Sequence, residues 1–367
     1  MQTLPVLSSL GNLLVGSVLF LLSGVAYSQT SVERFDASAL PDNTVVYTLP
    51  QTKLAIPIVV KKTVTTVGPL HLYAQKYLGI TDAASQPGTK YELEAVSLQA
   101  YGVPNPDLRY SVKFRNGSSA PFVYLTRDGI LCSINAEATH TEVIPSSQVL
   151  DESKQLPTAP RAMSQEYVQA TTDAQRAEIA AKEIFRLRES RINIVSGDAE
   201  QPFPDGQAMK LAIEGLEAQE RTLTSKFTGT THWQRKQEVV TDLPLDSATT
   251  IVAFRFSPDL GVLPAEDLRG EPIYLQTEVV EKAPALTEKE AARKAKKLKG
   301  VVYTIPGRMK ASLIYKGSLV ARKIIDVAQL GTQEALEPDH FNTRKETISI
   351  LFYPDTGAVS KVQGGEK

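Results

Sequence analysis

Residues whose types could carry chemistry are few in this sequence, and they stand far apart. The four histidines form no His-x-x-x-His pair and have no cysteine beside them, although a zinc site usually shows its ligands at short spacings. The only cysteine, Cys132, lies in an apolar run, has no partner for an intramolecular disulfide and is expected to be a small core residue. The sequence therefore predicts no catalytic residue, no cofactor and no metal site. The histidines are His71, His140, His232 and His340.

Paired carboxylates occur, and a glycoside hydrolase would use such a pair as acid and base. Glu92 and Glu94 lie two residues apart and would face the same side of a strand, and Glu266 is next to Asp267. Two acids on one strand indicate a solvated sheet face, because the acids of a glycosidase usually come from separate elements. An envelope glycan hydrolase whose carboxylates meet only in the folded chain remains the enzymatic alternative.

A run of cations near the C-terminal third of the chain is the clearest charge patch. Thr287 and Glu290 have the spacing of a capping box, so a short charged helix is expected near residues 287–298. The favoured interpretation is a solvated helix whose N-terminal end carries Glu288 and Glu290. The alternative is attachment to an anionic envelope polymer or a lipid surface. The patch consists of Arg293, Lys294, Lys296, Lys297 and Lys299.

Aromatic side chains offer another candidate surface, because exposed rings can line a face that binds glycans without turnover. Strands also use aromatic residues for ordinary cross-strand pairs, and this packing role is the favoured interpretation. The residues concerned are Tyr91, Tyr101, Tyr110, Phe114, Phe122 and Tyr124.

The N-terminal segment predicts export. An apolar run at Leu13–Leu22 has the length of a signal-peptide core, and Ala26 and Ser28 supply the small side chains that signal peptidase requires. We expect cleavage between Ser28 and Gln29, so that residues 1–28 are a signal peptide. The residues before the apolar run contain no Lys or Arg, and an uncleaved anchor is the alternative. No second apolar run is long enough to supply a transmembrane segment after cleavage.

Composition places the rest of the chain among ordinary globular proteins. The 367 residues include 40 Lys and Arg against 41 Asp and Glu, so the net charge is near −1. This balance gives no global reason to expect nucleic acid as a partner. Envelope proteins or glycans are the expected partners, and the composition leaves the oligomeric state open.

The pattern of apolar residues predicts an α+β protein with two β-rich modules, sandwich-like or barrel-like, and an antiparallel helical hairpin between them. The modules cover residues 40–150 and 228–362, where short runs of β-prone residues end at Gly, Pro and Asp-Gly turns. The hairpin covers residues 160–227, with Asp205 as the cap of its second helix. Its apolar stripes are Ala177, Ala180, Ala181, Ile184, Leu187 and Val195 in the first helix, and Met209, Ala212, Ile213, Leu216 and Leu223 in the second.

Two short matches suggest that the β-rich modules are copies of each other. Val45–Pro50 reappears as Val301–Pro306. Near the end of each module, an apolar strand, an Asp/Gly turn and a second strand recur at Phe122–Ile134 and Ile350–Val362. The collinear order of these matches supports a duplication. Chance similarity is the alternative, because strands draw on few residue types.

Five segments of the chain carry a resemblance to a known family: Val46–Pro50, Ala181–Arg188, Phe254–Ser257, Gly270–Ile273 and Val302–Pro306. Together they resemble domain of unknown function four-eight-three-one. Its members are exported proteins of Bacteroides-type bacteria without an assigned activity, so the resemblance implies the periplasm, the outer membrane or the cell exterior and carries over no site residue. The resulting hypothesis is a cell-envelope protein that binds or scaffolds partners without catalysis; a glycan hydrolase and a glycan-binding module are the alternatives.

Overall fold

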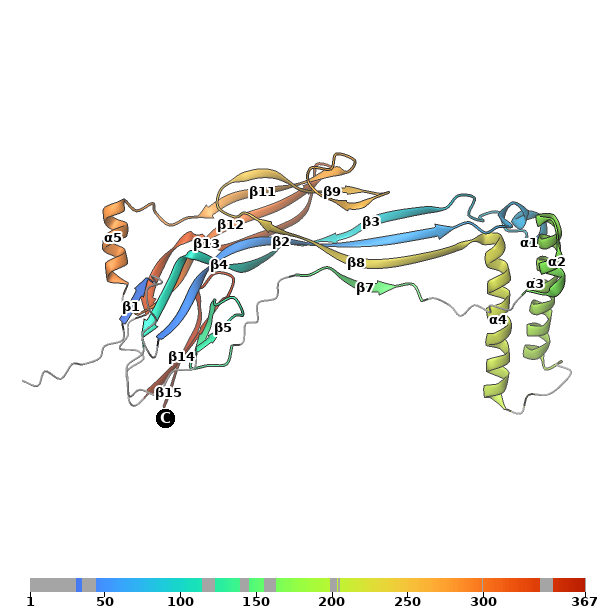
Figure 1. Ribbon diagram of the computed structural model, residues 1–367, viewed down its shortest axis with the longest axis horizontal. Helices are drawn as coiled ribbons and strands as arrows, with labels where there is room; N and C mark the ends of the chain where they lie inside the picture. Colours follow the sequence, from blue (N-terminus) through green and yellow to red (C-terminus); the bar gives the residue numbers. More distant parts are fainter. Residues whose placement is uncertain are drawn as a thin grey trace, which may run out of the picture.

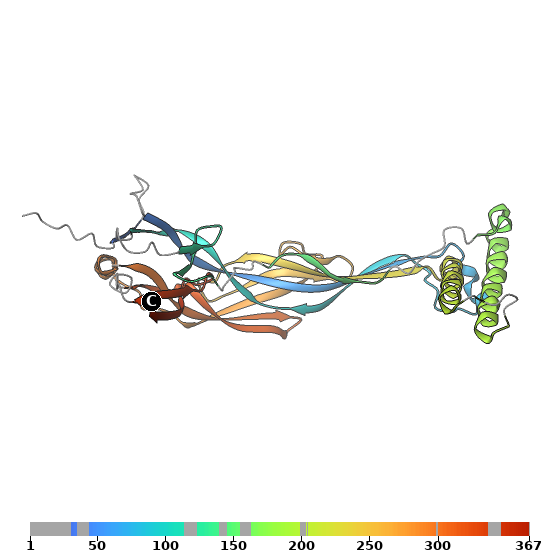
Figure 2. The same ribbon diagram turned by 90° about the horizontal axis from the view of Figure 1, so that it is seen from below.

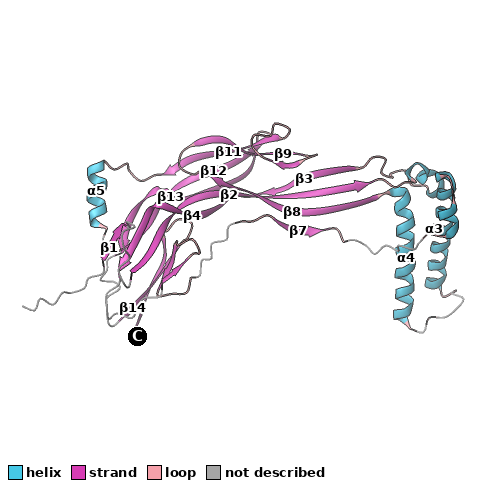
Figure 3. Cartoon of the chain, in the orientation of Figure 1, coloured by secondary structure: helices cyan, strands magenta, loops and turns pink. Residues whose placement is uncertain are grey.

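The computed structural model shows an elongated molecule with a β-sheet body at one end and a group of helices at the other. Long strands leave the body as a narrow arm, and most of the helices lie at the end of this arm (Figure 1). The same division is seen from below in Figure 2 and by element type in Figure 3. The structure describes residues 31–34, 44–113, 123–138, 145–154, 163–198, 203, 205–298, 300–336 and 346–366.

The first sheet runs from the body into the arm. Its strands are β1 (Ser31–Arg34), β2 (Thr44–Thr66), β3 (Gly88–Val96), β4 (Gln99–Lys113), β7 (Gln148–Glu152) and β8 (Thr230–Leu243). Their order is β1-β4-β2-β8-β7, with β3 also paired to β2, and all neighbours are antiparallel. The outer part of β2 lies between β3 and β8, and these three strands form the arm (Figure 1).

Two further sheets complete the body. The second sheet has the order β10-β9-β11-β12-β13, and the third has the order β15-β14-β6-β5. The strands of the second are β9 (Thr249–Ser257), β10 (Gly261–Leu263), β11 (Glu271–Glu281), β12 (Val301–Tyr315) and β13 (Ser318–Leu336). Those of the third are β5 (Val123–Leu125), β6 (Leu131–Ile134), β14 (Glu346–Phe352) and β15 (Val359–Glu366).

Side-chain caps mark the N-terminal ends of the longer helices. The helices are η1 (His71–Tyr73), α1 (Ala74–Leu78), α2 (Gln165–Gln169), α3 (Asp173–Ser196), α4 (Gly206–Thr228) and α5 (Glu288–Lys297). The Asp205 carboxylate accepts a hydrogen bond of 2.7 Å from the Ala208 N–H, which confirms the predicted cap of α4. Thr287 and Glu290 form the predicted capping box of α5.

The β-rich α+β class predicted from the sequence is confirmed, and two of the sheets combine strands from both predicted β-rich regions. Strand β8, which follows the helical hairpin, pairs with β2 over most of its length. Strand β14 pairs with β6 through Ile350 opposite Ile134. Strands from both sides of the predicted boundary at residue 228 therefore belong to the same sheets.

Three buried clusters stabilise the layers. The largest joins the first two sheets and includes Leu54, Ile56, Ile58, Phe254, Leu275, Leu313 and Val327. A second cluster joins the start of β2 and of β12 to the third sheet through Tyr47, Leu49, Ile134, Val302, Ile350 and Phe352. The third lies among the helices at the end of the arm, with Leu70, Ala74, Tyr167, Ile184, Leu223 and Phe227.

The pairing of the strands supports the proposed duplication. In β2 and β4, Thr48 pairs with Arg109 and the next pair is Pro50 with Pro104, so one residue is skipped on β2 and four on β4. In β12 and β13, Ile305 pairs with Thr332 and the next pair is Gly307 with Val327, which again skips one residue and four. The two irregularities fall within one residue of each other when Val45–Pro50 is aligned with Val301–Pro306.

The second match also has the same structural role in both halves. The Thr48 N–H donates a hydrogen bond of 2.9 Å to the Gly129 carbonyl, in the turn between β5 and β6. Its aligned residue Thr304 donates one of 3.0 Å to the Gly357 carbonyl, in the turn between β14 and β15. Equivalent strands thus bind equivalent hairpin turns, and this agreement supports the duplication.

The arm and the helical hairpin have no counterpart among the described residues of the second copy, and α3 and α4 lie between the two copies in the sequence. In the second copy, β12 and β13 are joined directly by a tight turn at Lys316 and Gly317, both with positive φ. In the first copy, β2 continues past the region paired to β4, and η1, α1 and β3 lie between them. The repeated unit therefore folds into the body without the elements at the far end of the molecule.

Two buried polar contacts join the copies. The Tyr47 hydroxyl donates to the Val302 carbonyl at 3.0 Å and accepts from the Val302 N–H at 2.7 Å, and burial raises the pKa of Tyr47 far above its usual value. The Gln329 side-chain amide pairs with both backbone groups of Thr52, since Oε1 accepts from Thr52 N–H at 3.0 Å and Nε2 donates to Thr52 O at 2.9 Å. Gln329 also donates to the Leu245 carbonyl at 3.1 Å.

We expect Tyr47→Phe to destabilise the protein by about 1–3 kcal/mol, because the buried N–H and C=O of Val302 lose their partner. Tyr303→Phe is the matched control: Tyr303 aligns with Tyr47 in the other copy and is half-buried. Urea unfolding measures both free energies. Equal values for the two variants would contradict this role of Tyr47.

We expect Gln329→Leu to cost about 1–3 kcal/mol or more, because buried backbone groups of Thr52 and Leu245 lose their hydrogen bonds to the side chain. Gln276→Leu, at a half-buried position of β11, is the control and should change the free energy of unfolding by less than about 0.5 kcal/mol. The measurement is chemical denaturation, and an unchanged midpoint for Gln329→Leu would show that this contact is dispensable.

Candidate functional site

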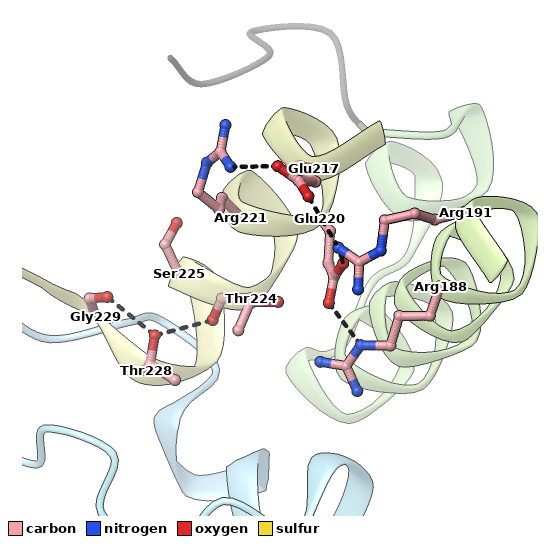
Figure 4. A pocket seen from close by; sticks show the side chains of 9 residues that line it. All are labelled: Arg188, Arg191, Glu217, Glu220, Arg221, Thr224, Ser225, Thr228 and Gly229. Atoms are coloured by element: carbon pink, nitrogen blue, oxygen red, sulfur yellow. Dashed lines mark hydrogen bonds and ion pairs between the residues drawn. The ribbon is translucent and has the colours of Figure 1, made fainter. Parts of the chain in front are cut away.

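A polar pocket lies between α3 and α4 where the helical hairpin meets the arm (Figure 4). Its volume is about 400 Å³. It is lined by Arg188, Arg191, Glu217, Glu220, Arg221, Thr224, Ser225, Thr228 and Gly229. Arg188 and Arg191 of α3 point toward Glu217 and Glu220 of α4, and Arg221 lies beside Glu217 on α4 itself.

Helical periodicity brings these side chains together. Glu217, Glu220, Arg221, Thr224 and Thr228 follow one another at spacings of one, three or four residues and therefore share one face of α4. Arg188 and Arg191 are separated by three residues on the facing side of α3. The sequence analysis did not single out these residues, although the i, i+3 spacing of the two arginines and the two glutamates is a readable signal.

Glu220 is at the centre of the ion pairs in the pocket. Its side chain is only 15% exposed, and its two carboxylate oxygens contact Arg188 Nε at 2.6 Å and Arg191 Nη1 at 3.0 Å. Glu217 lies 3.7 Å from Arg191 Nη1 and 3.6 Å from Arg221 Nη1. The arginines thus connect the two helices through both carboxylates, which is an arrangement that stabilises the hairpin and gives the pocket an excess of positive charge.

The hydroxyl groups of the pocket mostly bond to the backbone of their own helix. Thr228 Oγ1 donates to the Thr224 carbonyl at 3.2 Å and lies 3.1 Å from the Gly229 carbonyl, and Ser225 Oγ donates to the Thr222 carbonyl at 2.8 Å. A nucleophilic hydroxyl needs a neighbouring general base, and both glutamates of this pocket are engaged by guanidinium groups. The pocket therefore fits the binding of an anionic group better than acid–base chemistry.

Close backbone contacts hold the hairpin on the arm. Gly229 ends α4 with φ of 76°, and a Cβ at this position would lie 1.9 Å from the Thr66 carbonyl oxygen. A Cβ at Gly68 would lie 2.3 Å from the Lys226 carbonyl oxygen. Glycine is required at both positions because β2, β8 and the end of α4 approach each other here.

Apolar side chains remain exposed on the part of the hairpin that projects away from the arm. The predicted stripe of α3 is buried from Ala177 to Leu187, but Val195 is 66% exposed and was wrongly expected to be in the packed stripe. Ile192 is 63% exposed and Phe185 is 50% exposed. On α4, only Leu223 of the predicted stripe is fully buried, because the third buried cluster contacts the halves of α3 and α4 next to the arm.

The predicted carboxylate pairs lie on surfaces and face cations. Glu92 lies 3.6 Å from Lys61, and Glu94 lies 2.9 Å from Arg235, both across the strands of the arm. Asp267 lies 2.6 Å from Arg269, and the hydrogen bonds from Arg269 lower the pKa of Asp267 to about 2. These contacts agree with the interpretation of a solvated face.

The aromatic residues do not assemble into one exposed face among the described residues. Tyr101 and Tyr110 are buried, Tyr91 is half-buried and Tyr124 is exposed. Tyr110 stacks on Tyr47 with ring centroids 5.9 Å apart, which is a core contact. Phe114 and Phe122 lie outside the described residues.

The predicted basic patch lies on α5, at the end of the body opposite the helical hairpin (Figure 1). Lys294 is partly buried and pairs with Glu334 of β13 at 3.0 Å, whereas Arg293, Lys296 and Lys297 are exposed. Lys299 lies outside the described residues, as do Ser28 and Gln29 of the predicted cleavage site.

The isolated histidines and the cysteine do not form a site in the described part of the chain. Cys132 is buried in β6, His71 Nδ1 lies 2.9 Å from the Gly68 carbonyl oxygen, and His232 is exposed on β8. Within the described ranges, no group of His, Cys, Asp and Glu side chains could hold a metal ion. None of the helices described has the length and apolar character needed to cross a bilayer. His140 and His340 are not among the described residues.

Comparison with known proteins identifies the family and leaves the activity undefined. Searches of curated proteins and of solved structures found no match to this chain. The model of the family described as Domain of unknown function (DUF4831) matches residues 43–360, which include the body, the arm and the helical hairpin. The chain therefore belongs to the DUF4831 family.

Proposed function

We propose that this chain is an exported cell-envelope protein that binds or scaffolds a protein partner without catalysis, using the projecting half of its helical hairpin. The observation that carries the proposal is the exposed apolar stripe of α3, where Phe185, Ile192 and Val195 recur at spacings of seven and three residues. Contiguous apolar patches on the surface of a protein mark sites of interaction with other molecules.

The position of the hairpin supports the same function. The arm holds the hairpin far from the body, where a partner can approach it without contact with the sheets (Figure 1). The second copy takes its place in the body without an arm or a hairpin, and α3 and α4 lie between the two copies in the sequence, so the repeated unit does not require them. Binding residues are often found on elements that are added to a scaffold and are not needed for its core.

Export is proposed from the N-terminal segment, and a cell-envelope location follows from it. An apolar run followed by Ala26 and Ser28 has the features of a cleavable signal peptide. The glycan hydrolase alternative has less support, because the glutamates of the candidate pocket and those of the arm face arginine or lysine side chains.

We expect a photo-crosslinking side chain at Ile192 to join the protein to a discrete partner in intact cells. The same group at Val362, which is 55% exposed on β15 of the body, is the positional control. Phe185→Glu with Val195→Glu should abolish the crosslink and leave the free energy of unfolding within about 1 kcal/mol, because both side chains are exposed. A crosslink that survives the double substitution would contradict binding through the stripe.

We expect the protein from its natural host to begin at Gln29, because the small residues before it fit signal peptidase. Mass spectrometry of the intact protein from cell fractions measures the N-terminus. Ala26→Lys with Ser28→Lys should block cleavage and retain residues 1–28. Recovery of the uncleaved chain from the cytosol as its main form would contradict the export proposal.

A further inference from the structure

Helix α5 lies at the end of the molecule opposite the helical hairpin (Figures 1 and 2), and it carries a row of exposed cations. Lys289, Arg293, Lys296 and Lys297 occur at positions i, i+4, i+7 and i+8, so they share one face of the helix. All four side chains are exposed. None of the ion pairs found among the described residues uses them, whereas Lys294 on the other side of α5 pairs with Glu334 at 3.0 Å.

The face of α5 that contacts the body determines which way the row of cations points. Lys294 bonds to Thr332 as well as to Glu334, and Leu298, one turn further, packs against the second buried cluster. The capping box at Thr287 and Glu290 stabilises the N-terminal end of the helix. The helix is therefore held against β13 by one face, and the basic face is directed away from the body.

The chain enters the fold at the same end. Strand β1 begins at Ser31 and lies next to α5 in the ribbon view (Figure 1). Eight residues lie between the apolar run Leu13–Leu22 and Ser31, and eight residues span at most about 29 Å. While that run is in a bilayer, Ser31 therefore lies within roughly this distance of it, at the end of the body that also carries α5.

We propose that the basic face of α5 docks on an anionic phospholipid surface, so that the body lies on the membrane and the helical hairpin projects away from it. The occupant follows from charge complementarity, because rows of Lys and Arg on a helix attract the phosphate groups of anionic lipids. The inference rests on the export part of the proposed function and adds the surface that the body faces.

Vesicle sedimentation with the protein in its exported form tests this docking. The protein should bind vesicles of phosphatidylcholine mixed with phosphatidylglycerol, should not bind pure phosphatidylcholine, and should be released by salt. Each cation near an anionic surface contributes about 5-fold in affinity, so K289Q/R293Q/K296Q/K297Q should weaken binding on the order of 100-fold or more.

The matched control removes the same number of positive charges, three Lys and one Arg, from the part of the molecule away from α5. Lys182, Arg186 and Lys210 are exposed on the hairpin, and Lys154 is exposed just after β7, beside the arm. The variant K154Q/K182Q/R186Q/K210Q should bind vesicles as the parent protein does. Absence of binding by the parent protein, binding to neutral vesicles, or equal loss in the two variants would overturn the proposal. Circular dichroism and thermal unfolding verify that both variants are folded. Because the assay uses purified protein and lipid, its failure leaves the crosslinking result at Ile192 unaffected.

Discussion

The contact between Gln329 and Thr52 is the constraint on which the body depends, because it joins the two copies where the first and second sheets meet. Thr52 is fully buried, and its hydroxyl and both backbone groups bond to Asp355, Ala328 and Gln329 of the second copy. A buried backbone group without a partner costs about as much as a lost hydrogen bond. The side-chain amide of Gln329 takes the place of a neighbouring strand, so β2 continues into the arm without an unsatisfied segment at this point.

The arm extends from a body to which both copies contribute strands. Each copy contributes a hairpin to the third sheet, and each hairpin turn bonds to the first strand of its own copy through Thr48 or Thr304. The first copy extends β2 beyond the shared unit and pairs it with β3 and β8. Backbone hydrogen bonds between these strands stabilise the arm, and Gly68 and Gly229 allow it to join α4 closely.

The charges of the molecule are arranged differently at its two ends. Between α3 and α4, Glu217 and Glu220 neutralise most of the charge of three arginines and hold the helices together. On α5, the outer cations have no such partner among the described residues. The contacts of Lys294 with Glu334 and Thr332, together with the packing of Leu298, orient the helix. The same residue types therefore serve packing at one end and remain available for an external anion at the other.

The sequence by itself determined the local elements: the caps of α4 and α5, the β-rich regions, the helical hairpin and the two related segments are all signals carried by residues within a few positions of each other. Only the tertiary structure decided that β8 pairs with β2, that Gln329 meets Thr52, and that Val195 stays in solvent while Ile184 is buried. The physical reason is that helix caps and hydrophobic periodicity depend on neighbours along the chain. Backbone hydrogen bonds between strands depend little on which side chains the strands carry, so the sequence does not show which distant segments pair.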